Sequence, residues 1–237
     1  MIKFFRHFRK QLLTENKFSK YLLYAIGEIV LVVIGILIAL SINNWNEHSN
    51  QRIEEQRILV DLKNEVSLAI YSKIELRQRY KSKLDTLAFA LDKLFSTEVI
   101  ALTDPECINI AMTHIFDWEP SSVSTIEELV ASGKINLIRS EELRRKIILF
   151  RSISSSIELQ MNRVISEVHV LVDLYPELII RNWDGQFGVF NCDVSAMKKN
   201  RYFLAHLQSN RGRTGGLVRA ADDAIASLEE IIALIEV

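Results

Sequence analysis

One apolar stretch near the N-terminus constrains this chain more than any other feature. Within residues 21–42 the only charged side chain is Glu28, and residues 29–40 are all aliphatic apart from one glycine. A helix of about 20 such residues, rising about 1.5 Å per residue, crosses a hydrocarbon core about 30 Å thick. The sequence therefore predicts one transmembrane helix, with the lipid bilayer as its first partner.

The residues that flank this stretch indicate its ends and its orientation. Tyr21 and Tyr24 at one end and Trp45 at the other are side chains typical of membrane interfaces. Residues 1–42 carry six Lys and Arg against two Glu, a charge of +4, which leaves −5 for the rest of a chain whose net charge is −1. Because positively charged flanks stay in the cytoplasm, we expect the N-terminus inside and everything after Trp45 outside.

This topology divides the chain into three parts. We predict a basic cytoplasmic tail, a transmembrane helix and an outer helical domain, over residues 1–20, 21–45 and 46–237. In the tail, Ile2, Phe5 and Leu12 recur at helical spacing opposite basic residues, which favours an amphipathic helix on the inner membrane surface. A disordered tail that only sets the topology is the alternative. A cleaved signal peptide is another, because Ala39-Leu40-Ser41 fits a cleavage site, although signal peptides have apolar regions of only about 7–15 residues.

The outer domain begins with the period of an amphipathic helix. No Pro or Gly occurs in residues 46–95, and apolar residues there recur at intervals of three and four in two runs: Leu59, Leu62, Val66 and Ala69, then Tyr80, Leu84, Leu87, Leu91 and Leu94. Basic residues within 72–82 interrupt this pattern and predict a kink or break there.

Later helices are marked by their ends. Thr103 and Glu106 have the spacing of a capping box, and Gly133 is a typical residue to end a helix. Ser140 is expected to open a long helix that runs to about Tyr175, just before a proline. We expect a turn at Asp184-Gly185, and two last helices over about residues 195–210 and 214–235.

The predicted fold class is all-α. It consists of an N-terminal amphipathic segment, one transmembrane helix and an up-and-down helical bundle. In this arrangement Gly212 ends one of the last two helices and Thr214 caps the other.

Four residues of the membrane helix are candidates for packing or coupling. Gly35 and Ala39 are one helical turn apart, and Gly27 lies on nearly the same face, so two copies of the helix can approach closely there. Glu28 is costly in an apolar span, about 3 kcal/mol on insertion scales. It is interpreted as an interfacial residue, as part of a helix–helix contact, or as a proton-coupling carboxylate like that of ion-driven stator subunits.

The two cysteines, Cys107 and Cys192, are far apart in sequence and match no metal-binding spacing. In an oxidising compartment they can pair as one disulfide, and otherwise they are two buried thiols. The sequence leaves both interpretations open.

No motif in the outer domain predicts catalysis. His114, Asp117 and Glu119 lie close in sequence but lack a second cluster to complete a metal site. The glycine-rich residues 211–216 lack the Lys-Ser/Thr ending of a phosphate loop. We therefore expect no enzymatic activity, no cofactor and no metal.

The remaining histidines and the charge balance also predict no catalytic site and no nucleic-acid site. His48, His169 and His206 are isolated in sequence and are interpreted as surface or core residues. The mildly acidic outer domain has no basic stripe, so we expect no nucleic-acid partner.

Two stretches carry a family resemblance. Residues 15–40, followed by Ile42-Asn43-Asn44-Trp45-Asn46-Glu47, closely resemble the membrane segment of an uncharacterised family, a domain of unknown function, of small single-pass membrane proteins common in the Bacteroidota. Residues 125–144 resemble the same family. The resemblance implies a bacterial inner membrane with the C-terminal domain in the periplasm, and it implies no activity, cofactor or catalytic residue.

The function expected from these observations is a membrane-anchored periplasmic interaction or scaffold module. Its partner is expected to be a second copy of the chain, forming a homo-oligomer, or another envelope protein. The alternative is an accessory subunit of an ion-driven or transport complex that uses the intramembrane Glu28.

Overall fold

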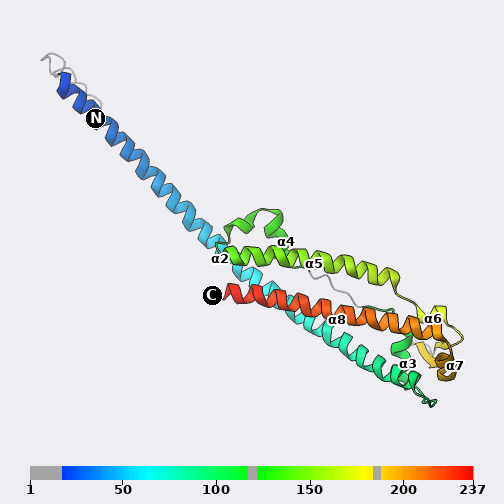
Figure 1. Cartoon of the computed structure of the whole chain (residues 1–237). Coiled ribbons are helices and arrows are strands. Elements are labelled where there is room, and N and C mark those ends of the chain that lie inside the picture. The colour runs from blue at the N-terminus through cyan, green and yellow to red at the C-terminus, as the bar shows by residue number, and fades with distance from the viewer. Residues whose placement is uncertain (1–17, 117–121, 184–187, 237) are drawn as a thin grey trace. The chain divides into compact units, whose positions relative to one another are not determined.

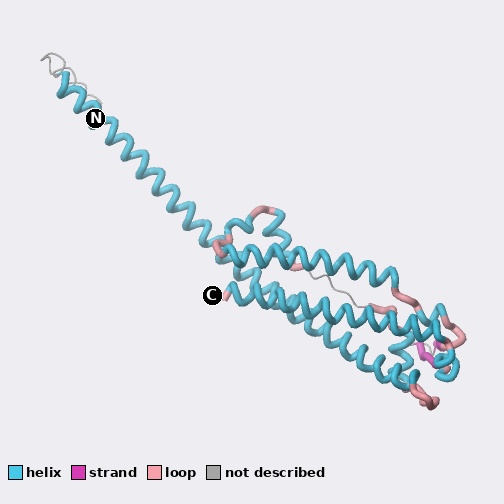
Figure 2. The backbone as a smooth tube through the Cα atoms, viewed as in Figure 1, coloured by secondary structure: helices cyan, strands magenta, loops and turns pink. Residues whose placement is uncertain are grey.

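The computed structural model describes residues 18–116, 122–183 and 188–236 (Figure 1). Its elements, in chain order, are α2 (Phe18–Phe95), α3 (Asp104–Ala111), α4 (Ser124–Ala131), the 3₁₀ turn η1 (Lys134–Leu137), α5 (Glu141–Glu167), α6 (Leu171–Leu174), β1 (Ile179–Trp183), β2 (Gly188–Cys192), α7 (Val194–Lys199) and α8 (Arg201–Ile235). The fold is all-α, as predicted, with one short two-stranded sheet (Figure 2). The chain divides into two compact units, Met1–Gln56 and Arg57–Val237.

Three long helical segments form the second unit. They are α2 from Arg57 onward, α5 and α8, and α5 and α8 lie side by side in opposite directions (Figure 2). The segment that holds α3 and α4 leads from one end of this unit back to the other, so that α5 runs in the direction of α2 (Figure 1). The predicted helical bundle is therefore confirmed, with α2 and α5 running in one direction and α8 in the other instead of a simple up-and-down order.

The core of this unit consists of three clusters of buried apolar side chains. The α4 core includes Leu62 and Val66 of α2, Ile126 of α4, Phe150 of α5 and Leu228 of α8. The middle core includes Leu76, Tyr80, Met161 and Leu217. The hairpin core includes Leu87, Ile110, Leu171, Ile179 and Phe203. Of these buried α2 residues, Leu62, Val66, Tyr80 and Leu87 belong to the two predicted apolar runs, and Leu76 lies between the runs.

Several helix ends are where the sequence predicts them. The backbone N–H of Thr103 donates to the Glu106 carboxylate (2.6 Å), and the Ser140 hydroxyl accepts from the Leu143 N–H (3.2 Å). Gly133 has a φ of 73°, a left-handed conformation that glycine adopts without steric cost. These local signals are confirmed because each depends on residues at most three positions apart.

The start of α4 is stabilised from a distant part of the chain. Glu65, on α2, accepts hydrogen bonds from the backbone N–H groups of Ser124 and Thr125, each at 2.8 Å. Burial raises the pKa of Glu65, but hydrogen bonds from Ser124 and Thr125 outweigh it and lower the pKa to about 2. A carboxylate at this place satisfies N–H groups that have no partner within the helix.

The predicted turn at Gly212 and Thr214 is wrong. The single helix α8 runs through both residues, and the Thr214 hydroxyl donates to the carbonyl of Asn210 at 3.1 Å. Buried residues continue at helical spacing on both sides of the glycines, among them Leu207 and Leu217. Their packing outweighs the cost of about 1 kcal/mol that each interior glycine adds.

Two other expectations are corrected. The break predicted within residues 72–82 does not occur: α2 is continuous there, and Leu76 and Tyr80 are buried in the middle core. Helix α5 ends at Glu167 instead of continuing to about Tyr175, and residues 168–170 form a non-helical connection to α6. The hairpin of β1 and β2 was not predicted, and the Asp184-Gly185 turn lies outside the described residues, as does the tail of residues 1–17.

Candidate functional site

The apolar stretch of α2 is exposed on all sides. Of the residues it contains, Leu31 is 73% exposed and Ile38 is 56% exposed, and its single charged residue, Glu28, is exposed as well. No part of its most apolar window is buried. Within the described residues, α2 is the one helix long and apolar enough to cross a membrane.

The structure places the predicted packing residues in this stretch. Gly27, Glu28, Gly35 and Ala39 are all exposed, and apart from the helix's own neighbouring backbone no described heavy atom lies within 4 Å of where a Cβ would stand on Gly27 or Gly35. Room for a second helix therefore exists at both glycines.

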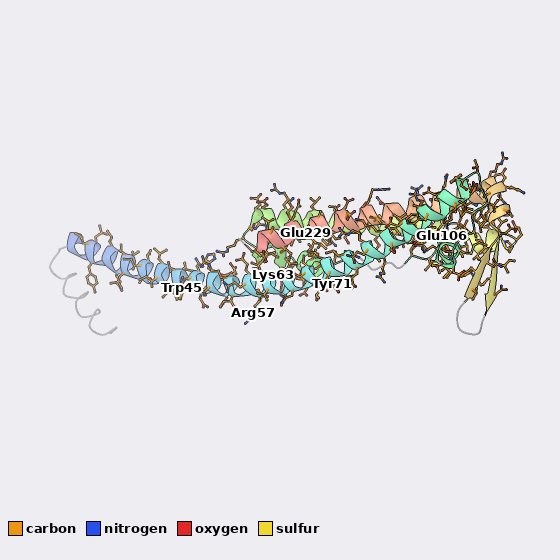
Figure 3. All side chains as sticks on the ribbon, turned by 90° about the horizontal axis from the view of Figure 1, so that it is seen from below. Trp45, Arg57, Lys63, Tyr71, Glu106 and Glu229 are labelled. Carbon is orange, nitrogen blue, oxygen red and sulfur yellow. A yellow bond between two sulfur atoms is a disulfide. The ribbon has the colours of Figure 1, made fainter. Side chains whose placement is uncertain are left out.

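The three aromatic anchors also lie in α2. Trp45 is 74% exposed and Tyr24 is half-buried, while the side chain of Tyr21 lies outside the described part (Figure 3).

A disulfide joins Cys107 of α3 to Cys192 at the end of β2. Their Cα atoms are 5.9 Å apart, and 85 positions separate them in sequence. The bond fixes the base of the hairpin, where Ile179 and Phe203 lie in the same core. Of the two interpretations that the sequence left open, the structure shows the paired cysteines.

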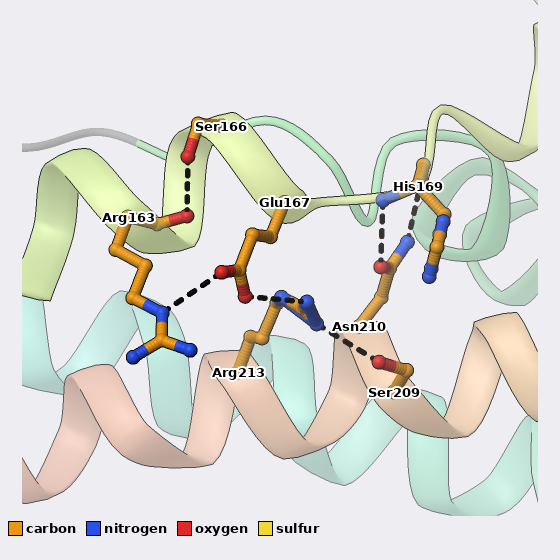
Figure 4. A network of polar contacts seen from close by, with 7 residues as sticks. All are labelled: Arg163, Ser166, Glu167, His169, Ser209, Asn210 and Arg213. Carbon is orange, nitrogen blue, oxygen red and sulfur yellow. Dashed lines mark hydrogen bonds and ion pairs between the residues drawn. The ribbon is translucent and has the colours of Figure 1, made fainter.

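A polar cluster lies where α5 gives way to α6, beside α8 (Figure 4). At its centre is Asn210 of α8, which is fully buried. The Asn210 Oδ1 accepts from the His169 N–H (3.1 Å), and its Nδ2 donates to the His169 carbonyl (2.7 Å) and to the Thr113 hydroxyl (3.0 Å). One side chain thus joins α8, the 168–170 connection and the residues that follow α3.

Two histidines form the surface of this cluster. The rings of His169 and His206 are stacked, with centroids 3.9 Å apart and planes 16° from parallel. The Tyr175 hydroxyl and the His206 Nδ1 are hydrogen-bonded at 3.0 Å, and the Tyr175 ring packs edge-on against Phe203. The fold thus brings together two histidines that lie 37 positions apart in the sequence.

A chain of ion pairs borders the histidines. The Arg163 Nε donates to one oxygen of Glu167 (2.8 Å), and the Arg213 Nη2 donates to the other (3.3 Å). Hydrogen bonding and charge from Arg163 and Arg213 lower the pKa of Glu167. Burial lowers the pKa of His169, and the nearby His206 ring and the Arg213 guanidinium lower it further. The site thus favours the neutral form of His169.

The residues considered for a metal site do not form one in the described part of the chain. His114 is half-buried and its pKa is lowered by burial, while Asp117 and Glu119 lie outside the described residues. Among the described residues, no group of three or more His, Cys, Asp or Glu is placed to hold a metal ion.

Comparison with known families identifies the class of this protein. Residues 28–157 match the family described as "Family of unknown function (DUF6090)". The match covers more than half of the chain, from the apolar stretch of α2 to the middle of α5. The chain belongs to this family. Comparison with curated proteins and with solved structures found no match.

Proposed function

We propose that this chain is a membrane-anchored interaction module. In this proposal, residues 22–42 of α2 cross the bacterial inner membrane, the N-terminus is cytoplasmic, and the unit Arg57–Val237 lies in the periplasm. The observation that carries the proposal is the apolar stretch of α2, whose most apolar window is not buried by any described part of the chain. A helix with apolar side chains on all sides is favourable in lipid, because its backbone hydrogen bonds are satisfied within the helix and its side chains contact hydrocarbon instead of water.

The disulfide supports the proposed side of the membrane. Disulfides persist in oxidising compartments, including the bacterial periplasm, and are rare in the cytosol. Cys107 and Cys192 both belong to the second unit. The charge asymmetry of the sequence, with a basic N-terminal segment, favours the same orientation independently.

A role in protein–protein contacts is supported by two surfaces. The first is the face of the membrane helix with Gly35 and Ala39, which allows close approach of a second helix. The second is on α2 of the outer unit, where Val60, Leu68 and Tyr71 lie on one face and are 59%, 71% and 63% exposed. Exposed apolar residues that share a face mark interaction surfaces. The proposed partner is a second copy of the chain or another envelope protein.

A role as accessory subunit of an ion-driven or transport complex is the second candidate. It is favoured by Glu28, the single charged side chain of an otherwise apolar stretch, because intramembrane carboxylates commonly serve ion or proton pathways. Here the partner is a multi-span membrane protein.

The test is purification of the full chain in mild detergent after crosslinking, with mass spectrometry of what accompanies it. A Gly35→Leu variant is compared with Val33→Leu, which introduces the same side chain on the opposite side of the same helix. Self-association predicts a crosslinked oligomer that Gly35→Leu weakens and Val33→Leu leaves intact. A stoichiometric multi-span partner, lost in Glu28→Gln, supports the second candidate. A lone monomer in every case contradicts both, and the intact mass shows whether the apolar stretch has been cleaved off.

A further inference from the structure

The connection between α5 and α6 is held to α8 in an unusual way. Residues 168–170 are not helical, and the helical hydrogen bonds of α6 begin only at the Val170 carbonyl, which accepts from the Leu174 N–H at 3.0 Å. His169 supplies the attachment: its backbone N–H and carbonyl both bond to Asn210, and its ring lies on that of His206. This small set of contacts connects the long helix α5 to the hairpin core.

We propose that the stacked His169 and His206 rings form an acid-sensitive latch, which holds the 168–170 connection against α8 while both imidazoles are neutral and loosens it when they bind protons. Stacking places the two ring centres 3.9 Å apart. Two neutral imidazoles tolerate this distance, whereas two imidazolium ions repel each other strongly.

The charges around the latch favour its response to acid. On α8, Arg213 is a fixed cation close enough to lower the pKa of His169. At the end of α5, the Glu167 carboxylate is engaged by Arg163 and Arg213, so its charge is already compensated.

The other elements around the latch supply little to offset added positive charge. On the α6 side, the neutral Tyr175 is hydrogen-bonded to His206. Burial raises the pKa of Tyr175, and the negative charge of Glu177 raises it further. Burial lowers the pKa of His114, and the positive charges of Lys83 and Arg181 lower it further, whereas the Asp173 carboxylate opposes them. On the remaining side, Asn210 and Thr113 are neutral. Protonation of both stacked rings therefore meets mainly repulsion.

The sign of the effect follows from the lowered pKa of His169. A histidine whose pKa is lower in the folded protein than in the unfolded chain binds fewer protons when folded. The stability that neutral His169 gives to the latch is therefore complete above the ordinary histidine pKa. This stability is lost as the pH falls below that value. In the proposed periplasmic location, the outer unit thus has a contact that responds to mild acid.

The test uses the full chain in lipid nanodiscs with labelled histidines. Nuclear magnetic resonance follows each histidine ring, and hydrogen exchange gives the protection factors of residues 168–170 between about pH 8 and about pH 5. His206→Phe keeps a flat ring for stacking and removes one titrating group. His48→Phe, at an exposed position of the other unit, is the matched control.

The expected results are specific to the pair. In the wild type and in His48→Phe, protection of residues 168–170 falls with pH. In His206→Phe, protection persists to lower pH, and the pKa of His169 rises toward its ordinary value. If His206→Phe does not fold, His169→Phe tests the same pair from the other side. Unchanged protection between the two pH values, or a pKa of His169 that is insensitive to His206→Phe, would overturn the proposal.

Discussion

Two stretches of the same helix, residues 22–42 and 57–95 of α2, have opposite relations to their surroundings. In the first, apolar side chains cover every side and none is buried, as at Leu37, which is 56% exposed. In the second, apolar side chains form a stripe, and those of Leu62, Val66 and Leu87 have no exposed surface. Both stretches are regular α-helix, so the difference lies in what their side chains contact.

This difference shows that helix formation and burial are separate properties of a sequence. Apolar residues at three- and four-residue intervals form one face of a helix, and the rest of the second unit buries that face. An apolar surface on all sides needs an environment without water, and the described residues of the protein do not cover it. The predictions below test whether the two stretches respond to substitution as these two environments require.

The largest expected effect concerns the disulfide, which stabilises only the second unit. Replacing Cys107 and Cys192 together by Ser should lower the free energy of unfolding of that unit by about 4 kcal/mol, because the bond closes a long loop in the unfolded chain. Urea denaturation in detergent, followed by circular dichroism, measures the loss. The variant should stay in the membrane fraction, since residues 22–42 are unchanged. Equal denaturation curves with and without reductant would contradict this.

A charge in the first stretch should have the next largest effect. Ile34→Arg raises the cost of membrane insertion by about 3.5 kcal/mol, the difference between the two side chains at the centre of a span. The fraction of the protein that resists carbonate extraction should fall. Leu68→Arg, at a position of the second stretch that is 71% exposed, is the control and should remain in the membrane. The account fails here if both variants are extracted to the same extent.

The same Leu→Ala change in both stretches sharpens the comparison further. Leu87→Ala removes a side chain that is fully buried in the hairpin core and should cost about 3 kcal/mol of unfolding free energy. Leu37→Ala should leave the unfolding of the second unit unchanged within about 0.5 kcal/mol. Denaturation of both variants in the same detergent compares them directly, and similar losses would show that residues 22–42 are part of the folded core.

The smallest effect is expected at Glu65, whose carboxylate binds the start of α4. Its pKa of about 2 lies below the ordinary value, so its contribution is complete above about pH 4.5 and is lost as the pH falls toward 2. Glu65→Gln should cost about 1 kcal/mol at neutral pH, as the loss of a helix cap does, and less in acid. Thermal melts at several pH values measure this. The control is Asp61→Asn, an exposed position on the same helix; an identical pH dependence in both variants would argue against the cap.

Sequence reasoning succeeded where the signal is local or periodic. The buried stripe of α2, the capping residues at Thr103 and Ser140, and the helix end at Gly133 all follow from neighbouring residues. It failed at Gly212, where a local helix-breaking signal was outweighed by buried residues on either side of the glycines. Glycine therefore predicts a helix end only where core packing does not continue beyond it.

The polar cluster could not be predicted from the sequence, because its residues are far apart along the chain. The partners of Asn210 lie 41 and 97 positions away, and nothing near Asn210 identifies them. The same holds for Cys107 and Cys192, whose spacing allowed pairing but did not require it. An amide within an apolar helix pattern signals a buried polar contact, but its partners emerge only from the fold.

The most direct test of the central claim is protease protection in spheroplasts that carry an epitope tag at the N-terminus. The account predicts that external protease removes the unit Arg57–Val237 and leaves a short tagged fragment, which includes the apolar stretch and remains with the membrane. Adding detergent should abolish the protection of the tag. Loss of the tag with survival of the outer unit, or release of the intact chain from the membrane by carbonate, would contradict a single membrane span with a cytoplasmic N-terminus.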